Sequence, residues 1–185
     1  MKICIFCSAG SGLPQAYHNA AAETGTLLAR RGHSLVYGGC DHGLMGDIAR
    51  AAARGGAAVE GIIPNAFRGD GDRSPYCTQV TYTESMRARK ALMQERAEAF
   101  LVLPGGIGTL DELFDTTVLQ TLGQLNKPLV LLNTEGCYDL LAALLDQMVQ
   151  QNLLTTKNRE FYRFIDTPAG CLDYLERCKG ERDVL

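Results

Sequence analysis

Short apolar runs alternate with amphipathic segments along most of the chain. The runs at residues 99–103 and 128–133 are apolar at nearly every position, which is typical of strands buried on both faces. Apolar runs predict strands at residues 2–7, 33–37, 57–63, 79–83, 99–103, 128–133 and 161–165. The segments between them have apolar residues at helical spacing and predict helices at residues 14–31, 44–54, 84–96, 109–122, 138–150 and 168–179. Residues 65–76, rich in Gly, Asp, Arg, Ser and Pro, predict a mobile surface loop, a candidate lid.

This alternation of strands and helices defines the expected fold class. It predicts an α/β protein with a single-domain, doubly wound, Rossmann-like parallel sheet and helices on both faces. We expect the domain to span residues 1–180 and to be followed by a short polar tail at residues 181–185. Because ligands of such folds bind beyond the carboxyl ends of the strands, the residues that follow each strand are the first candidates for chemistry.

Composition and charge exclude several classes of protein. The chain has 185 residues, of which 46% are hydrophobic and 21% charged, a balance that argues against disorder. The net charge of −3 provides no basic field for nucleic acid or an anionic membrane, so neither is an expected partner. Only five apolar residues lie between Lys2 and Ser8, so we expect no signal peptide and a cytoplasmic protein. The seven cysteines are an odd set and are expected to be reduced.

Glycine-rich turns follow three of the predicted strands, at residues 8–12, 38–46 and 104–109. Glycine lets the backbone approach a ligand closely, and the helix that follows presents unpaired N–H groups to an anion. The three turns therefore predict a phosphate site at one edge of the sheet. The alternative for any one of them is a tight strand-to-helix connection without a ligand.

Most cofactor motifs are missing from the sequence. The first turn lacks the third glycine of G-x-G-x-x-G, and no G-K-[ST] occurs, which argues against a nicotinamide cofactor and a P-loop. No G-x-S-x-G nucleophile motif is present, and the three histidines are too dispersed for a zinc site. Lys90 is the one lysine well placed for pyridoxal phosphate, but nothing marks it as buried. We expect no metal and no cofactor.

Glu112 is a candidate catalytic carboxylate. It lies three residues after Thr109, in the first turn of the predicted helix, within reach of a phosphate ligand at that helix N-terminus. The spacing also matches a T-x-x-E capping box, in which the glutamate binds the backbone at the start of the helix. The spacing alone leaves both interpretations open.

A cationic face precedes this motif in the chain. Met86, Arg89 and Lys90 are three and four residues apart, so they share one face of the helix predicted at residues 84–96. That face either points at the ligand or is a solvated surface, which is the commoner role of such clusters.

The segment 104–112 reads PGGIGTLDE and resembles the P-G-G-x-G-T-x-x-E motif of the LONELY GUY family, which comprises cytokinin riboside 5′-monophosphate phosphoribohydrolases. Further matches in order and spacing include Gly38-Gly39, Gly43-Leu44-Met45-Gly46 and Met86 with Arg89-Lys90. The resemblance implies hydrolysis of the N-glycosidic bond of nucleoside 5′-monophosphates, AMP or N6-modified cytokinin ribotides, by a homodimer. It implies that Arg89 and Glu112 are catalytic. The substrate-binding residues that it implies are Gly39, Met86, Lys90, Gly105, Gly106, Ile107, Gly108 and Thr109.

Two other functions compete with this one. A non-catalytic carrier would use the same cradle for a nucleotide or a phosphorylated cofactor, as the related molybdenum-cofactor carriers do. The carrier hypothesis is based on differences from the family near the expected pocket. The chain has Arg87 where the family usually has His, and Val118-Leu119 where the family usually has Thr-Trp. The second competitor is a nicotinamide-dependent oxidoreductase.

Overall fold

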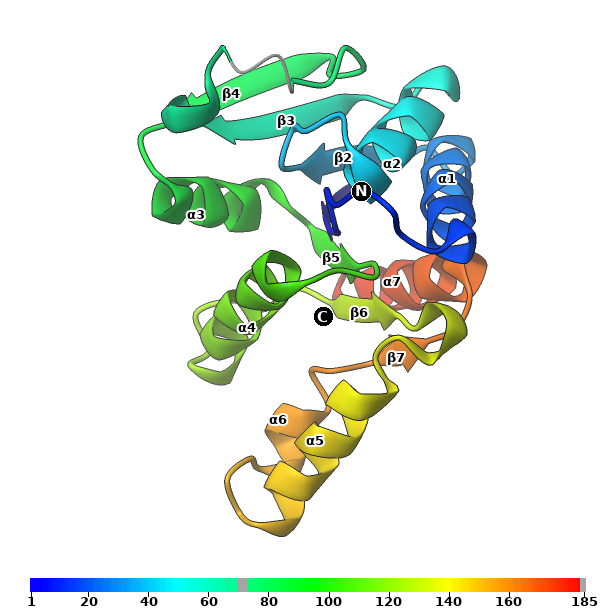
Figure 1. The fold of residues 1–185 in the computed structure, drawn as a ribbon. Coiled ribbons are helices and arrows are strands. Elements are labelled where there is room, and N and C mark those ends of the chain that lie inside the picture. Colours follow the sequence, from blue (N-terminus) through cyan, green and yellow to red (C-terminus); the bar gives the residue numbers. More distant parts are fainter. Residues whose placement is uncertain (70–72, 184–185) are drawn as a thin grey trace.

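The computed structural model describes residues 1–69 and 73–183, and its centre is a sheet of seven parallel strands (Figure 1). The strands are β1 (Lys2–Phe6), β2 (Ser34–Tyr37), β3 (Val59–Pro64), β4 (Gln79–Thr83), β5 (Ala99–Val102), β6 (Leu129–Leu132) and β7 (Phe164–Ile165). Their order across the sheet is β4-β3-β2-β1-β5-β6-β7, and each neighbouring pair is parallel. The predicted α/β class with a parallel sheet is confirmed.

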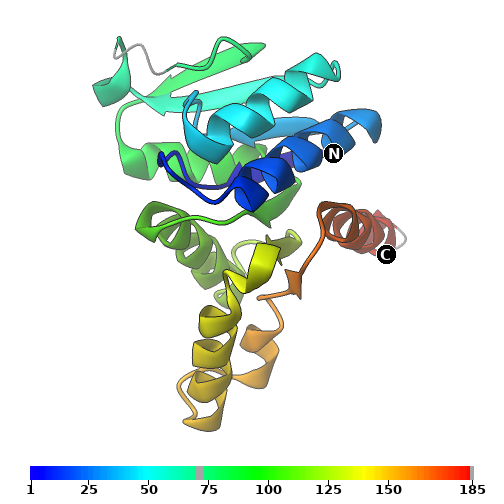
Figure 2. The same ribbon diagram turned by 45° about the vertical axis from the view of Figure 1, so that its right-hand side comes forward.

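Helices cover both faces of this sheet, as predicted (Figure 1 and Figure 2). One face carries α1 (Gln15–Arg30), α2 (Gly43–Arg54) and α7 (Pro168–Asp183), and the other carries α3 (Met86–Arg96), α4 (Ile107–Thr121) and α5 (Asp139–Gln150). Alternation along the strands produces this division. Ile3 and Ile5 of β1 belong to the core cluster under the first set of helices, whereas Cys4 and Phe6 belong to the cluster under the second.

The strand order reverses between β1 and β5, because β2 to β4 lie on one side of β1 and β5 to β7 on the other. The turns that follow these two strands meet at the carboxyl edge. Ser8 donates its backbone N–H to the Pro104 carbonyl at 3.2 Å, and Leu44 of α2 donates its N–H to the Ser8 carbonyl at 2.9 Å. Open α/β sheets bind ligands in the crevice at such a reversal.

Some local boundaries differ from the predicted ones. Helix α4 begins at Ile107, two residues earlier than expected. The predicted loop 65–76 opens with a 3-10 helix, η1 (Asn65–Phe67), and its residues 70–72 lie outside the described residues. The short elements η2 (Thr134–Gly136) and α6 (Thr156–Arg159) were not predicted, because one turn of helix has no hydrophobic period. Helix α7 continues to Asp183, past the expected end of the domain at residue 180.

Helices α5 and α6 project from the body of the sheet in both views (Figure 1 and Figure 2). Only Leu145 of α5 is buried, and the neighbouring Leu140 and Leu144 are exposed. Within residues 1–69 and 73–183, no helix has the length and the apolar character needed to span a membrane.

Candidate active site

The turn between β5 and α4 has two kinds of glycine. A β-carbon on Gly105 would collide with the side chain of Thr109, which is buried, so this glycine lets the turn fold back onto the start of the helix. A β-carbon on Gly106 or Gly108 would meet no atom within 4 Å. These two glycines therefore leave open space at the helix N-terminus, where the first N–H groups have no partner within the helix. The arrangement suits an anion, because the helix dipole adds positive potential there.

Glu112 does not form the capping box that its spacing allowed. The N-cap of α4 is Gly106, three residues before Thr109, and no side chain caps this end of the helix. The carboxylate instead accepts a hydrogen bond from the Arg89 guanidinium, Oε1 from Nη2. Glu112 is only 4% exposed, so the pair is held away from solvent. The capping interpretation is wrong, and the carboxylate faces a cation on a different helix.

Burial controls the protonation of this carboxylate. Desolvation raises the pKa of Glu112 to about 7, against the opposing effects of the Arg89 charge and hydrogen bond. A carboxyl group that titrates near neutral pH is suited to proton transfer or to stabilising a developing positive charge.

Arg89 reaches Glu112 from α3, a helix that follows β4. Ser85 caps this helix by accepting a hydrogen bond from the Ala88 N–H at 3.1 Å. The Arg89 side chain is 12% exposed, and its buried Nε has no hydrogen-bond partner in the described part of the chain. It also passes close to Gly38 after β2, where a β-carbon would lie 3.3 Å from Nη1. An unsatisfied donor of this kind is rare in a folded protein and points to a ligand or an ordered water.

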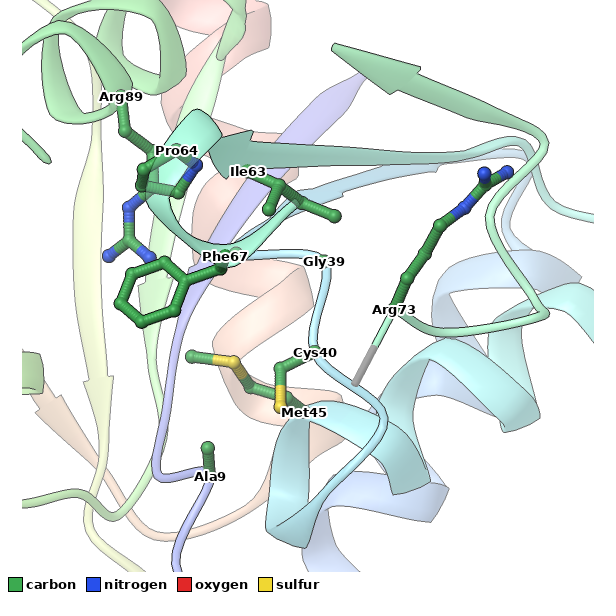
Figure 3. A pocket seen from close by; sticks show the side chains of 10 residues that line it. Ala9, Gly39, Cys40, Met45, Ile63, Pro64, Phe67, Arg73 and Arg89 are labelled. Atoms are coloured by element: carbon green, nitrogen blue, oxygen red, sulfur yellow. The ribbon is translucent and has the colours of Figure 1, made fainter. Parts of the chain in front are cut away.

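Two cavities of about 250 Å³ each adjoin at Arg89. The first, called the polar cavity below, contains Glu112 and the turn of α4; its lining residues are Cys7, Ser8, Ala9, Met45, Arg89, Gly106, Gly108, Thr109 and Glu112. The second, called the apolar cavity below, extends under η1; its lining residues are Ala9, Gly38, Gly39, Cys40, Met45, Ile63, Pro64, Phe67, Arg73 and Arg89 (Figure 3). Because Ala9, Met45 and Arg89 line both, the two form one continuous site.

The structure brings together most of the residues predicted for the site. Arg89, Gly106, Gly108, Thr109 and Glu112 line the polar cavity. Gly39 lines the apolar cavity at a φ of +80°, and a β-carbon there would collide with Ile63, so only glycine fits this turn.

Four predicted residues lie outside the lining of the two cavities: Gly105, which supports the turn, and Met86, Lys90 and Ile107. The side chain of Ile107 is 83% exposed, and Met86 at the start of α3 is 45% exposed. Lys90 binds two carboxylates of α4, Asp111 at 3.0 Å and Asp115 at 3.2 Å. Although partial burial lowers the pKa of Lys90, the hydrogen bonds that its ammonium donates to both aspartates raise it overall. An amine must lose its proton to form a Schiff base, so Lys90 does not suit pyridoxal phosphate chemistry.

Several lining residues were not predicted as site residues. Met45, Ile63, Pro64 and Phe67 form the apolar cavity together with Gly38 and Gly39. Phe67 lies in the segment expected as a loop, so no hydrophobic period marked it. Its position three residues after Pro64, where the predicted strand stops, was the available signal, because side chains that follow the carboxyl ends of parallel strands meet at one edge. Val118, where the sequence departs from the family, is 55% exposed on α4 and does not line the two cavities.

The fold and the site together define a Rossmann-like α/β protein with a glycine-rich anion cradle beside a buried Arg–Glu pair. A family model described as "Possible lysine decarboxylase" matches residues 45–175. Cytokinin riboside 5′-monophosphate phosphoribohydrolase LOG2 of Arabidopsis thaliana is 39% identical over 182 residues, covering 98% of this chain and 85% of LOG2. LOG1 of the same plant is 39% identical over 158 residues, covering 85% of this chain and 74% of LOG1. The chain belongs to the LONELY GUY family.

Solved structures with the same fold include molybdenum-cofactor proteins. The molybdenum cofactor carrier protein of Chlamydomonas reinhardtii superposes with a TM-score of 0.72 at 18% identity, covering 97% of this chain and 98% of the carrier. The molybdenum cofactor binding protein of Rippkaea orientalis has a TM-score of 0.73 at 19% identity, covering 95% of each chain. At this level of identity the likeness establishes the Rossmann-like fold only.

Proposed function

We propose that this protein hydrolyses the N-glycosidic bond of nucleoside 5′-monophosphates, releasing the free base and ribose 5-phosphate. The observation that carries the proposal is the buried pair of Glu112 and Arg89, which lies beside the open N-terminus of α4 in a single cavity. The sequence relationship to LOG2 and LOG1, which are named for this reaction, supports it.

The reaction needs a group that stabilises positive charge on the ribose and orients the attacking water, and a group that holds this first one in position. Glu112 and Arg89 suit these two roles. As the bond between the base nitrogen and C1′ breaks, positive charge develops on the ribose, as in glycoside hydrolysis. Ionised Glu112 stabilises that charge and orients the attacking water, whose oxygen forms the new bond to C1′. The proton released by the water leaves with the base. Arg89 holds the Glu112 carboxylate in place and presents its unsatisfied Nε to the substrate.

The phosphate of the substrate binds at the cradle formed by residues 105–109. Gly106 and Gly108 leave space for its oxygens, and the first N–H groups of α4 donate to them. Ile107 contributes its backbone, since its side chain faces away. Lys90 adds a positive charge one residue beyond Arg89, and Met86 begins the same helix.

We further propose a homodimer in which a second copy covers one face of α4. Phe114, Val118 and Leu122 are exposed and are four residues apart, so they form an apolar stripe along the helix that also carries Glu112. Exposed apolar stripes of this kind mark protein–protein contacts. The mass of the protein in solution, measured by light scattering, tests the dimer. We also propose a cytoplasmic location, because the seven cysteines are an odd set scattered through apolar segments.

The test is to incubate the protein with AMP and with N6-isopentenyl-AMP and to follow free base and ribose 5-phosphate by chromatography. Equimolar release of both products from either nucleotide is the expected result. The relative rates then identify the preferred base.

The second candidate, a carrier that binds without hydrolysis, is favoured by the likeness of the fold to molybdenum-cofactor carriers. It predicts saturable binding of AMP or another phosphorylated ligand without release of base. Steady release of base would exclude it. A folded protein that binds AMP and releases none would exclude the hydrolase instead.

A further inference from the structure

One large aromatic side chain of the site is left half-exposed. Phe67 is 52% exposed and belongs to neither of the two core clusters formed by the described residues. It lines the apolar cavity, on the side opposite α2 (Figure 3). A single exposed apolar side chain is common, but this one lines a cavity that also contains Arg89, whose buried Nε has no hydrogen-bond partner in the described part of the chain.

We propose that Phe67 is a specificity-determining residue of the site, and that its ring stacks on the base of the bound nucleotide. The inference rests on the proposed function, because it takes the substrate to be a nucleoside monophosphate. It goes further by assigning the two cavities to the two halves of that substrate.

The chemistry of the two cavities supports this assignment. The polar cavity has the helix N-terminus and Glu112, so it takes the phosphate and the ribose. The apolar cavity is lined by Met45, Ile63 and Pro64, which offer apolar contacts and suit a flat heteroaromatic ring, and Arg73 also lines it. Arg89 lines both cavities, which places the bond to be broken at their junction.

The backbone that carries Phe67 is held by the local fold. Pro64 ends β3 and precedes η1, and the Arg68 N–H donates to the Asn65 carbonyl at 3.0 Å, which closes the turn. The Arg68 guanidinium then lies 4.6 Å from the centre of the Tyr82 ring on β4. These contacts attach η1 to the neighbouring strand. Because this backbone is already ordered, only the side-chain rotation of Phe67 has to be restricted when a base stacks on its ring.

The test compares Phe67→Ala, Phe67→Leu and Phe67→Tyr with the unchanged protein. Loss of an aromatic platform should raise the KM for AMP about tenfold or more, with a much smaller change in kcat. Phe67→Leu should resemble Phe67→Ala, because it keeps apolar volume but has no ring face. Phe67→Tyr should retain the KM of the unchanged protein. Leu153→Ala, which truncates a 68% exposed side chain that does not line either cavity, is the matched control.

Inhibition by ribose 5-phosphate provides the second readout. This product has no base, so its inhibition constant should be the same in Phe67→Ala and in the unchanged protein. An equal rise for AMP and for ribose 5-phosphate would mean that Phe67 only supports the fold of the site, and the proposal would be wrong. Full retention of the KM in Phe67→Leu would likewise exclude stacking.

Failure of the proposed function can be told apart from failure of this inference. If the unchanged protein releases no base, calorimetric titration with AMP still measures binding. Weaker AMP binding in Phe67→Ala, with ribose 5-phosphate binding unchanged, would then support the stacking role in a protein that binds without hydrolysis. Equal AMP affinity in both proteins would overturn it.

Discussion

Arg89 and Lys90 are consecutive residues of α3, and both bind carboxylates of α4, yet the two ion pairs lie in different surroundings. Arg89 meets Glu112 in a pair whose side chains are 12% and 4% exposed, at the junction of the two cavities. Lys90, itself 17% exposed, meets Asp111 and Asp115, whose side chains are 57% and 39% exposed. Burial raises the pKa of Glu112 to about 7, whereas the exposed pair has water as a competitor. Position in the fold, not charge, separates the candidate catalytic pair from a surface contact.

Removing the charge of the buried carboxylate should have the largest effect. Glu112→Gln keeps the shape of the side chain but cannot stabilise positive charge on the ribose, so we expect kcat for AMP to fall about 10³-fold. Asp111→Asn, the matched change in the exposed pair, should leave kcat within a factor of about two. Base release measures both. Melting temperatures should stay within a few degrees, and a large fall in Glu112→Gln would favour a structural role for the carboxylate.

Exchanging the cation of the buried pair should have the next largest effect. Arg89→Lys keeps the charge but has no planar fork and no Nε donor, so we expect kcat/KM to fall about 10²-fold. Arg96→Lys is the control, because it makes the same change in the same helix beside Glu60, away from the site. Similar activity in both variants would show that charge alone is needed at residue 89.

The raised pKa of Glu112 predicts a pH dependence of activity. If the ionised carboxylate acts, kcat/KM should rise about tenfold per pH unit below 7 and level off above it. A profile that falls through pH 7 would mean that the protonated form is the active one.

Stability should change in the opposite direction over the same range. The carboxyl of Glu112 titrates near 7 in the folded protein and near its ordinary value of 4.5 when unfolded. The folded state therefore binds more protons between these values, and the free energy of unfolding should fall as the pH rises from 4.5 to 7. Denaturation of Glu112→Gln, which has no proton to lose, should not show this component of the slope.

Removing the Lys90 cation, whose aspartate partners are exposed, should have the smallest effect. In Lys90→Met the ion pairs with Asp111 and Asp115 are lost, and pairs of this exposure contribute up to about 1 kcal/mol each. We therefore expect the melting temperature to fall by a few degrees and the KM for AMP to rise less than about tenfold. A fall in kcat/KM as large as the one expected for Arg89→Lys would assign Lys90 a direct contact with the phosphate.

Much of the fold follows from local patterns in the sequence. Runs such as residues 99–103 are apolar on both faces, which requires a sheet covered by helices on both sides, and the structure has that sheet. Gly105 marks a turn in which a β-carbon would collide with Thr109, and Gly106 and Gly108 leave open space beside it, so the cradle at the start of α4 was also predictable. The family motif pointed to Arg89 and Glu112 before their contact was known. Periodicity, glycine content and motif spacing are local properties, and the sequence alone determines them.

The partners of these residues were decided by tertiary structure. Spacing left Glu112 between a cap and a catalytic role, and the choice depended on Arg89, 23 residues earlier in the chain, which packing brings to the carboxylate. The same packing placed Lys90 against Asp111 and Asp115 and put Phe67 at the edge of a cavity. Burial, and with it the pKa of a carboxyl group, depends on which distant segments exclude water from a side chain. Residues close in the sequence do not determine which distant segments cover a side chain. Only the folded chain therefore distinguishes the buried Arg89–Glu112 pair from the ion pairs of Lys90 with its exposed aspartates.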